Sequence, residues 1–466
     1  MTSMSLLRKI FAISAIACMV SALLIPATGQ RIVRTRVKED TAKASTPAPS
    51  APAAAFIAGD VVVYRVGDTS AALSSAAAPA FLDEYTPAGA LVQTIALPTA
   101  VSGSNRICTN AGSATSEEHM RLSTNTQFLV WGCYDAAVAT ATVASGAANR
   151  VIGRAGSNAV VDTSTFMTDG TGNIRSVAST NGTDFWVATS SSGTRFTTYG
   201  STTTSTAVAG TPSNVRVMGI FAGQLYESSA VAPNIGVNTV GTGLPTTTGQ
   251  TVTALNGGPG NTGTGPSPYS FAFLNANTLY VADDRATASG GGIEKWTLNA
   301  GTWTLATTFN GGLTSGVRSL TLRPNSLGQA VIFATTAEAT TRLVTLVDDG
   351  LTTNFTALAS APAGANPTAF RSVAFAPLTP TAAGVTVSGR VMDSLGAGVR
   401  NARVTLQDQG GNVRSAVTNA FGYYTFQDVQ SGGTYIVGAA ARGYAFNQRV
   451  VQTFDALTDV NFTPNQ

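Results

Sequence analysis

The chain has 466 residues, of which 44% are hydrophobic and only 11% are charged, and its formal net charge is +3. That length allows two or three domains with cores of their own, and the apolar content is typical of a folded protein. So few basic residues argue against nucleic acid as a partner, because binding it requires clustered Lys and Arg. The 48 glycines favour an all-β chain with many turns.

The first 29 residues are typical of a signal peptide. Arg8 and Lys9 precede an apolar run at 10–25, and small residues then offer a cleavage position before Gln30. A lipid on Cys18 and an uncleaved membrane anchor are the alternatives. No other stretch approaches the roughly 20 apolar residues that a membrane helix needs. We therefore expect a secreted or cell-envelope-associated protein whose mature chain has no transmembrane span.

Residues 30–55 predict a low-complexity tether. The segment mixes opposite charges and then becomes a run of Pro, Ala and Ser that cannot bury a core. Its basic residues could touch an anionic surface, but acidic neighbours dilute them. We expect a solvated spacer.

A short motif of apolar and small polar residues recurs through the next part of the chain. Each copy opens a cluster of short alternating segments, which is the pattern of pleated strands. The copies lie at 119–124, 173–180, 215–220, 267–273, 317–324 and 370–377. A strand cluster that returns about every 40 to 55 residues is typical of the blades of a β-propeller.

We count six blades between residues 56 and 377, and a seventh is an alternative if the long second or fourth segment hides one. The fifth blade is the clearest, with four strands over 268–309. The last motif, at 370–377, has no blade after it, whereas the strand at 60–66 lacks an opening strand. We therefore predict that these two segments pair and close the ring. This part of the chain resembles bacterial β-propellers in general.

The sequence changes character after a linker at 378–384. About seven short alternating strands over 385–464, separated by glycine-rich turns, predict a small β-sandwich.

This C-terminal part carries a recognisable set of sequence pieces. They are Gly389-Arg390-Val391, GAGVRNARVTL at 396–406, TNAFGYYTF at 418–426 and Gly433-Thr434-Tyr435. In order and spacing they resemble the carboxypeptidase regulatory-like domain, a transthyretin-like sandwich often appended to bacterial exported proteins. The resemblance implies an accessory role and brings no catalytic residues.

Two cysteines remain after removal of the signal peptide, Cys108 and Cys133. An even pair in an exported protein favours a disulfide. Two separate buried thiols are the alternative.

His119 is the single histidine of the chain. A zinc hydrolase takes two or three histidines, so the sandwich does not accompany a zinc peptidase here. A Ser-His-Asp triad would have to use His119, and the chain has no G-x-S-x-G turn to present a serine. We predict no catalytic residue and interpret His119 as a polar residue at the edge of an inner strand.

Carboxylates at strand ends are weak candidates for a metal site. Lactonase-like six-bladed propellers hold calcium at the channel mouth through oxygen ligands, and calcium prefers six to eight of them. The candidates are Asp283, Asp284, Asp348 and Asp349. None has the spacing of a known calcium loop, so the simpler interpretation is that they accept hydrogen bonds from turn amides.

Arginines recur in the opening strands of the blades and are weak candidates for ligand binding. They are Arg121, Arg175, Arg216, Arg318 and Arg371, with Tyr269 in the remaining strand. If their positions coincide, five guanidinium groups would surround one mouth of the channel and attract an acidic ligand. The interpretation that we favour is that each arginine reaches sideways to a backbone carbonyl or a carboxylate of the next blade.

These observations favour an exported, non-enzymatic protein that acts in binding, adhesion or cell-surface scaffolding. Its expected partner is an unidentified protein or glycan at the cell surface, and we expect no cofactor, with calcium as the exception to test. The alternative is a calcium-dependent lactonase or hydrolase-type propeller enzyme. Three or four oxygen ligands that converge near the channel axis would favour that alternative.

Overall fold

The computed structural model describes residues 53–260, 266–325, 327–379, 384–453 and 456–464. The predicted signal peptide and nearly all of the tether lie outside the described residues. Within the described residues, no helix is long and apolar enough to cross a lipid bilayer. Their regular structure is strand, apart from two 3₁₀ turns at Val143–Ser145 and Thr287–Ser289.

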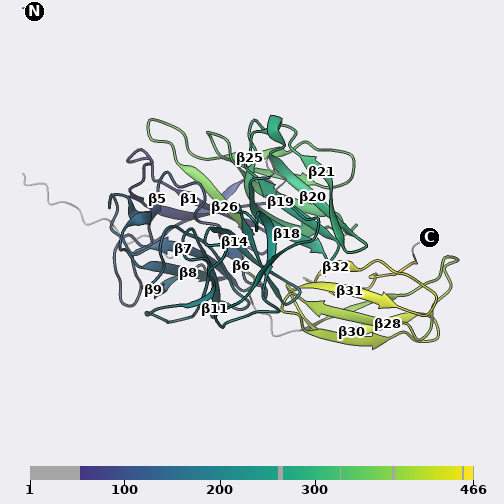
Figure 1. Cartoon of the computed structure of the whole chain (residues 1–466). Coiled ribbons are helices and arrows are strands. Elements are labelled where there is room, and N and C mark those ends of the chain that lie inside the picture. Colours follow the sequence, from purple (N-terminus) through teal and green to yellow (C-terminus); the bar gives the residue numbers. More distant parts are fainter. Residues whose placement is uncertain (1–52, 261–265, 326, 380–383, 454–455, 465–466) are drawn as a thin grey trace, which may run out of the picture. The chain divides into compact units, whose positions relative to one another are not determined.

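Six four-stranded antiparallel sheets form the blades of a propeller (Figure 1). Blade 1 contains β26 (Ala369–Phe375), β1 (Val61–Val66), β3 (Ala80–Tyr85) and β4 (Leu91–Ala96). Blade 2 contains β6 (Arg121–Leu122), β7 (Phe128–Tyr134), β8 (Arg150–Gly156) and β9 (Val161–Met167). Blade 3 contains β10 (Ile174–Ala178), β11 (Asp184–Thr189), β12 (Thr194–Thr198) and β13 (Thr206–Ala209).

The other three blades follow in chain order. Blade 4 contains β14 (Val215–Phe221), β15 (Gln224–Ser229), β16 (Gly236–Val240) and β17 (Val252–Ala254). Blade 5 contains β18 (Pro268–Asn275), β19 (Thr278–Asp283), β20 (Gly292–Asn299) and β21 (Thr302–Phe309). Blade 6 contains β22 (Val317–Pro324), β23 (Ala330–Thr336), β24 (Arg342–Val347) and β25 (Thr356–Ser360). This is the six-bladed ring that the motif spacing predicts.

Blade 1 closes the ring by joining the two ends of the propeller sequence. Strand β1 pairs antiparallel with β26, from Val61 opposite Phe375 to Val66 opposite Ala369. The predicted pairing of these segments is therefore confirmed. The small sheet of β2 (Ala77–Ala78) and β5 (Asn110–Ala111), which joins the loops on either side of β3 and β4, was not predicted.

Strand β1 shows why the strands near the axis are apolar almost throughout. Val62 and Tyr64 belong to a buried cluster that contains Trp131 of blade 2, whereas Val61 and Val63 belong to another that contains Phe333 of blade 6. Successive side chains of a strand point to opposite faces. Because each face of a blade packs on a neighbouring blade, both sets of side chains have to be apolar.

The C-terminal part forms two small sheets. The first pairs β27 (Gly384–Arg390) with β30 (Tyr423–Gln430). The second has the order β29 (Val413–Val417), β28 (Arg403–Asp408), β31 (Thr434–Ala440) and β32 (Arg449–Gln452). Side chains of both sheets, including Val404 and Phe426, share one buried cluster drawn wholly from this part of the chain. The arrangement is the predicted β-sandwich.

Because this core is self-contained, we expect residues 383–466 to fold when expressed alone. The fragment should give the circular dichroism spectrum of a β protein and a cooperative melting transition. A Phe426→Asp variant is the control, because it places a charge in the core and should abolish the transition. A wild-type fragment that stays unfolded would show that the sandwich depends on the propeller.

Candidate ligand-binding site in the propeller channel

β-bulges in the inner strands present the candidate side chains. In four of these strands the ladder register shifts at the candidate arginine, and in β18 it shifts across Tyr269. A bulge leaves the extra residue unpaired and re-aims its side chain. The residues at these irregular positions are Arg175, Arg216, Tyr269, Arg318 and Arg371.

Serine hydroxyls set the level of the inner strands relative to one another. In three blades the serine that follows the bulged arginine accepts a hydrogen bond from a backbone N–H of the next blade. The donor and acceptor pairs are Met218 to Ser176 (3.2 Å), Val373 to Ser319 (3.2 Å) and Met120 to Ser372 (3.0 Å). Equivalent bonds mark equivalent positions, so they can be used to align the blades.

This alignment places a carboxylate in blade 2 where the other blades carry arginine or tyrosine. Met218 and Val373 each lie two residues after a bulged arginine, Arg216 and Arg371 respectively. By the same count, the ring position of blade 2 lies two residues before Met120. That residue is Glu118, whose φ of 62° departs from regular strand geometry. We call the six equivalent residues the axial ring: Glu118, Arg175, Arg216, Tyr269, Arg318 and Arg371.

Arg121 lies three residues beyond the ring position of its blade, so the structure brings together four of the five candidate arginines at one level. Its guanidinium group donates to Ser270 Oγ at 3.2 Å and to the carbonyl oxygen of Phe271 at 3.0 Å. These residues belong to blade 5, which is opposite blade 2 in a ring of six. Arg121 therefore spans the channel. A Cβ on Gly219 would lie 3.1 Å from its Nη2.

Arg175 and Arg216 have only neutral hydrogen-bond partners. Arg175 donates to the carbonyl oxygen of Val215 in blade 4 at 3.2 Å, and Arg216 to that of Pro268 in blade 5 at 3.1 Å. Arg175 also donates to the side-chain oxygen of Asn214, and Arg216 donates to that of Ser267. The Arg216 guanidinium group lies 4.1 Å from the centre of the Tyr269 ring. Both arginines thus reach to the next blade, but neither positive charge meets a carboxylate.

The other two ring arginines do meet carboxylates. Arg318 Nε lies 3.4 Å from Asp284 Oδ2, and Arg371 Nε lies 3.7 Å from Glu118 Oε2. Arg371 also donates from Nη2 to the carbonyl oxygen of Gly112 at 2.5 Å. These contacts neutralise part of the positive charge in the ring.

His119 lies among the arginines. Its side chain is 1% exposed, its ring centre is 5.6 Å from that of Tyr269, and neither ring nitrogen hydrogen-bonds to any described residue. Burial, and then the charges of nearby arginines including Arg121 and Arg175, hold the pKa of His119 well below its ordinary value. The imidazole is therefore neutral, and its nitrogens are available as one donor and one acceptor.

Two buried glutamates lie beside the ring. Glu117 accepts hydrogen bonds from the Tyr134 hydroxyl at 2.7 Å and from Asn173. Glu118 is fully buried with the side chains of Glu117 and Asn110 beside its carboxyl group, and neither of its oxygens makes a hydrogen bond of regular geometry with the described residues. Burial, and then the charge of Glu117, raise the pKa of Glu118 well above its ordinary value.

Each of the four candidate metal ligands has a hydrogen-bond or ion-pair partner within the protein. Asp283 accepts from the backbone N–H of Ser267 at 3.1 Å and pairs with Arg285 at 2.7 Å, next to the Asp284 pair with Arg318. Asp348 pairs with Lys295 Nζ at 2.6 Å.

Asp349 accepts from the backbone N–H of Leu351 at 2.8 Å, as expected of a turn carboxylate. Within the described residues, no group of three or more His, Cys, Asp or Glu side chains is arranged to hold a metal ion.

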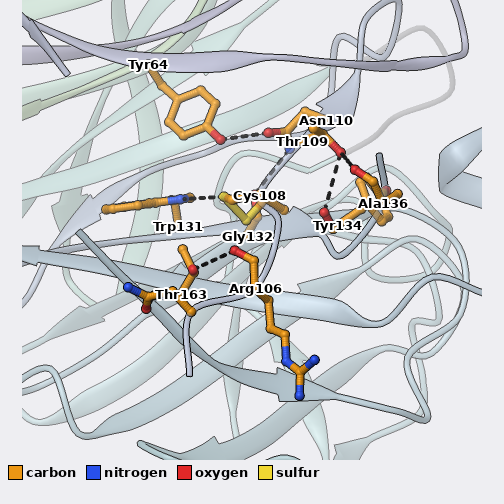
Figure 2. The surroundings of a disulfide bond; sticks show 12 residues. Tyr64, Arg106, Cys108, Thr109, Asn110, Trp131, Gly132, Tyr134, Ala136 and Thr163 are labelled. Carbon is orange, nitrogen blue, oxygen red and sulfur yellow. Dashed lines mark hydrogen bonds between the residues drawn. A yellow bond between two sulfur atoms is a disulfide. The ribbon is translucent and has the colours of Figure 1, made fainter. Parts of the chain in front are cut away.

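The predicted disulfide is present and joins the segment just before β5 to β7 of blade 2. Cys108 and Cys133 are fully buried, and their Cα atoms are 5.1 Å apart. Figure 2 shows the indole nitrogen of Trp131 directed at Cys108 Sγ, at 3.4 Å.

The disulfide also anchors the segment that leads to the ring glutamates. Just after Cys108, the side chain of Asn110 accepts a hydrogen bond from the Tyr64 hydroxyl at 2.7 Å (Figure 2). The next residue, Ala111, donates its N–H to Glu117 at 3.2 Å. The disulfide therefore helps to position the glutamates through this short segment.

Sequence reasoning missed Glu117 and Glu118. The signal was present, since Glu118-His119-Met120 occupies the place of Arg175-Ser176-Val177 in the next blade. We aligned Arg121 with the arginines of the other blades, although the equivalent residue of blade 2 is Glu118, three positions earlier.

Comparison with known proteins identifies the C-terminal part of the chain. Residues 386–464 match the carboxypeptidase regulatory-like domain, which confirms the resemblance seen in the sequence. No curated protein matches the sequence at a significant level. The chain thus combines a six-bladed β-propeller with a carboxypeptidase regulatory-like domain.

Two similar solved structures are proteins provisionally assigned as 6-phosphogluconolactonases. The one from Bacteroides uniformis is 10% identical with a TM-score of 0.36, and the match covers 82% of this chain and 100% of that one. The one from Bacteroides fragilis is 10% identical with a TM-score of 0.39, and the match covers 80% and 96%. Likeness at this level carries no argument about the site.

Proposed function

We propose that this is an exported binding protein whose propeller channel takes an acidic ligand, and that it is not an enzyme. One observation carries the proposal: among the described residues, the guanidinium groups of Arg175 and Arg216 at the channel axis hydrogen-bond only to neutral groups. A partly buried cation that no carboxylate contacts directly favours a carboxylate, sulfate or phosphate group, which can accept charge-assisted hydrogen bonds.

The balance of charge at the axis supports an anionic ligand. The five candidate arginines face three carboxyl groups, those of Glu117, Glu118 and Asp284. Even with all three ionised, the cations outnumber them by two. The raised pKa of Glu118 widens this excess, because a protonated carboxyl carries no charge.

The rest of the chain supports export and an accessory role. A buried disulfide is typical of proteins that mature in an oxidising compartment, which agrees with the predicted signal peptide. The regulatory-like domain adds a second folded module without catalytic residues. An acidic glycan or an acidic surface protein outside the cell fits these features as partner.

We expect the protein to bind sulfate and acetate, and the double variant Arg175→Gln, Arg216→Gln to bind each about tenfold more weakly or worse, because each arginine contributes charged hydrogen bonds. Isothermal titration calorimetry at low ionic strength measures this. Arg414→Gln in the sandwich is the matched control, since it removes the same charge far along the chain.

Two results would contradict the proposal. The first is equal binding by the wild type and the double variant. The second is turnover of a lactone or ester with stoichiometric calcium, lost on Asp283→Ala or Asp348→Ala, which would favour the enzymatic alternative. Metal analysis after dialysis, together with melting curves in calcium and in chelator, completes the test.

A further inference from the structure

We propose that the axial ring binds a hydroxy acid end group, that is, a carboxylate with a hydroxyl on the neighbouring carbon. The proposal rests on the proposed function and specifies the ligand further. It follows from the buried polar atoms of the ring that have no partner, because such atoms are rare in folded proteins and each one calls for a ligand or a role.

The unsatisfied donors point to an anion. Arg175 Nε and Arg371 Nε are buried and make no hydrogen bond with the described residues. Two buried N–H groups from different blades that lack an acceptor suit the oxygens of a carboxylate, which accepts from several donors at once.

The unsatisfied acceptor points to a donor on the same ligand. Both oxygens of the Glu118 carboxyl group are buried without a hydrogen bond of regular geometry to the described residues, and Oε2 lies 3.7 Å from Arg371 Nε. A ligand whose carboxylate reaches Arg371 therefore places its neighbouring atoms beside Glu118. A hydroxyl there donates to Glu118, and the unpartnered His119 nitrogens offer a second contact.

The charge of the surroundings selects a hydroxyl over an ammonium group. Five guanidinium groups lie around His119 and the ring, and a cationic ligand group would be repelled by the same field that attracts the carboxylate. A neutral hydroxyl supplies the missing donor without that repulsion.

Burial limits how much of the ligand enters. Glu118 is 0% and His119 1% exposed, whereas Arg175, Arg216 and Arg318 are half-buried. The end group therefore enters past these three arginines, and Arg121 blocks the channel beyond. We therefore restrict the proposal to a terminal group, such as that of an acidic sugar or a short hydroxy acid, with the remainder of the ligand outside.

The test compares four small probes that differ by one group: glycolate, acetate, glycine and glycolamide. We expect glycolate to bind about tenfold tighter than acetate, the gain of one hydrogen bond to the buried Glu118 carboxyl group. Glycine should bind more weakly than glycolate because of its ammonium group, and glycolamide, which lacks the negative charge, should bind most weakly.

Glu118→Met removes the acceptor at similar side-chain size and should reduce the glycolate-to-acetate ratio to about one. Arg414→Gln should leave that ratio unchanged.

The outcomes separate this proposal from the function on which it rests. Equal binding of glycolate and acetate by the wild type, with both weakened by Arg175→Gln, would overturn the hydroxy acid assignment and leave an acidic ligand standing. Tighter binding of glycine than of glycolate would also overturn it. Failure of every anion to bind would overturn both. The wild-type comparison decides the matter even if Glu118→Met fails to fold.

Discussion

Glu227→Gln is expected to stabilise the propeller by about 4 kcal/mol at pH 8 and by almost nothing at pH 4. Glu227 lies in β15 with 0% exposure, its only side-chain partner is the Thr194 hydroxyl, and its Oε1 atom has none among the described residues. Burial raises the pKa of Glu227 to about 8. A buried carboxylate must therefore either ionise at a cost or keep its proton.

The direction of the pH dependence follows from proton binding. Between the unfolded pKa, near 4.5, and the folded pKa, near 8, the folded state holds a proton that the unfolded state releases. Stability of the wild type therefore falls as pH rises through this window. The glutamine amide of the variant cannot ionise, so the variant should lack that fall. Thermal melting from pH 4 to pH 8 measures both proteins.

Glu338→Gln is the matched control because its expected effect has the opposite sign. Hydrogen bonds from Arg342, Thr314 and Thr336 lower the pKa of Glu338 to about 2 against the effect of burial. Its stabilisation is present above the unfolded pKa and is lost as pH falls toward 2, so this variant should be less stable at neutral pH. A Glu227→Gln advantage that does not change between pH 4 and pH 8 would show that Glu227 titrates normally.

The double variant Cys108→Ser, Cys133→Ser is expected to lower the free energy of unfolding by about 3 kcal/mol. The disulfide spans a sequence separation of 25 residues, and in the chain-entropy model closing such a loop restricts the unfolded chain by this amount. Urea denaturation without reductant measures the loss. The wild type in reductant should match the double variant.

The same variant should also weaken anion binding, because the disulfide anchors the segment from Asn110 to Glu117. An unchanged denaturation midpoint would mean that the buried contacts around Trp131, rather than the cross-link, hold this segment in place.

The sequence by itself determined the architecture of this protein, since the features that specify a propeller are local. A strand is specified by a run of six to eight mostly apolar residues, as in Val61–Val66 and Pro268–Asn275, and a blade by four such runs. The disulfide was equally accessible, because only Cys108 and Cys133 remain once the signal peptide is set aside.

The tertiary structure alone decided which side chains meet at the axis. A bulge shifts the register by one residue without changing the apolar pattern, so the level of each arginine depends on hydrogen bonds between blades. The bond from Met120 to Ser372 therefore places Glu118 in the ring and leaves Arg121 to span the channel. Partners such as Lys295 for Asp348 come from a neighbouring blade. Contacts between residues distant in sequence depend on how neighbouring blades pack against each other, which no local pattern specifies.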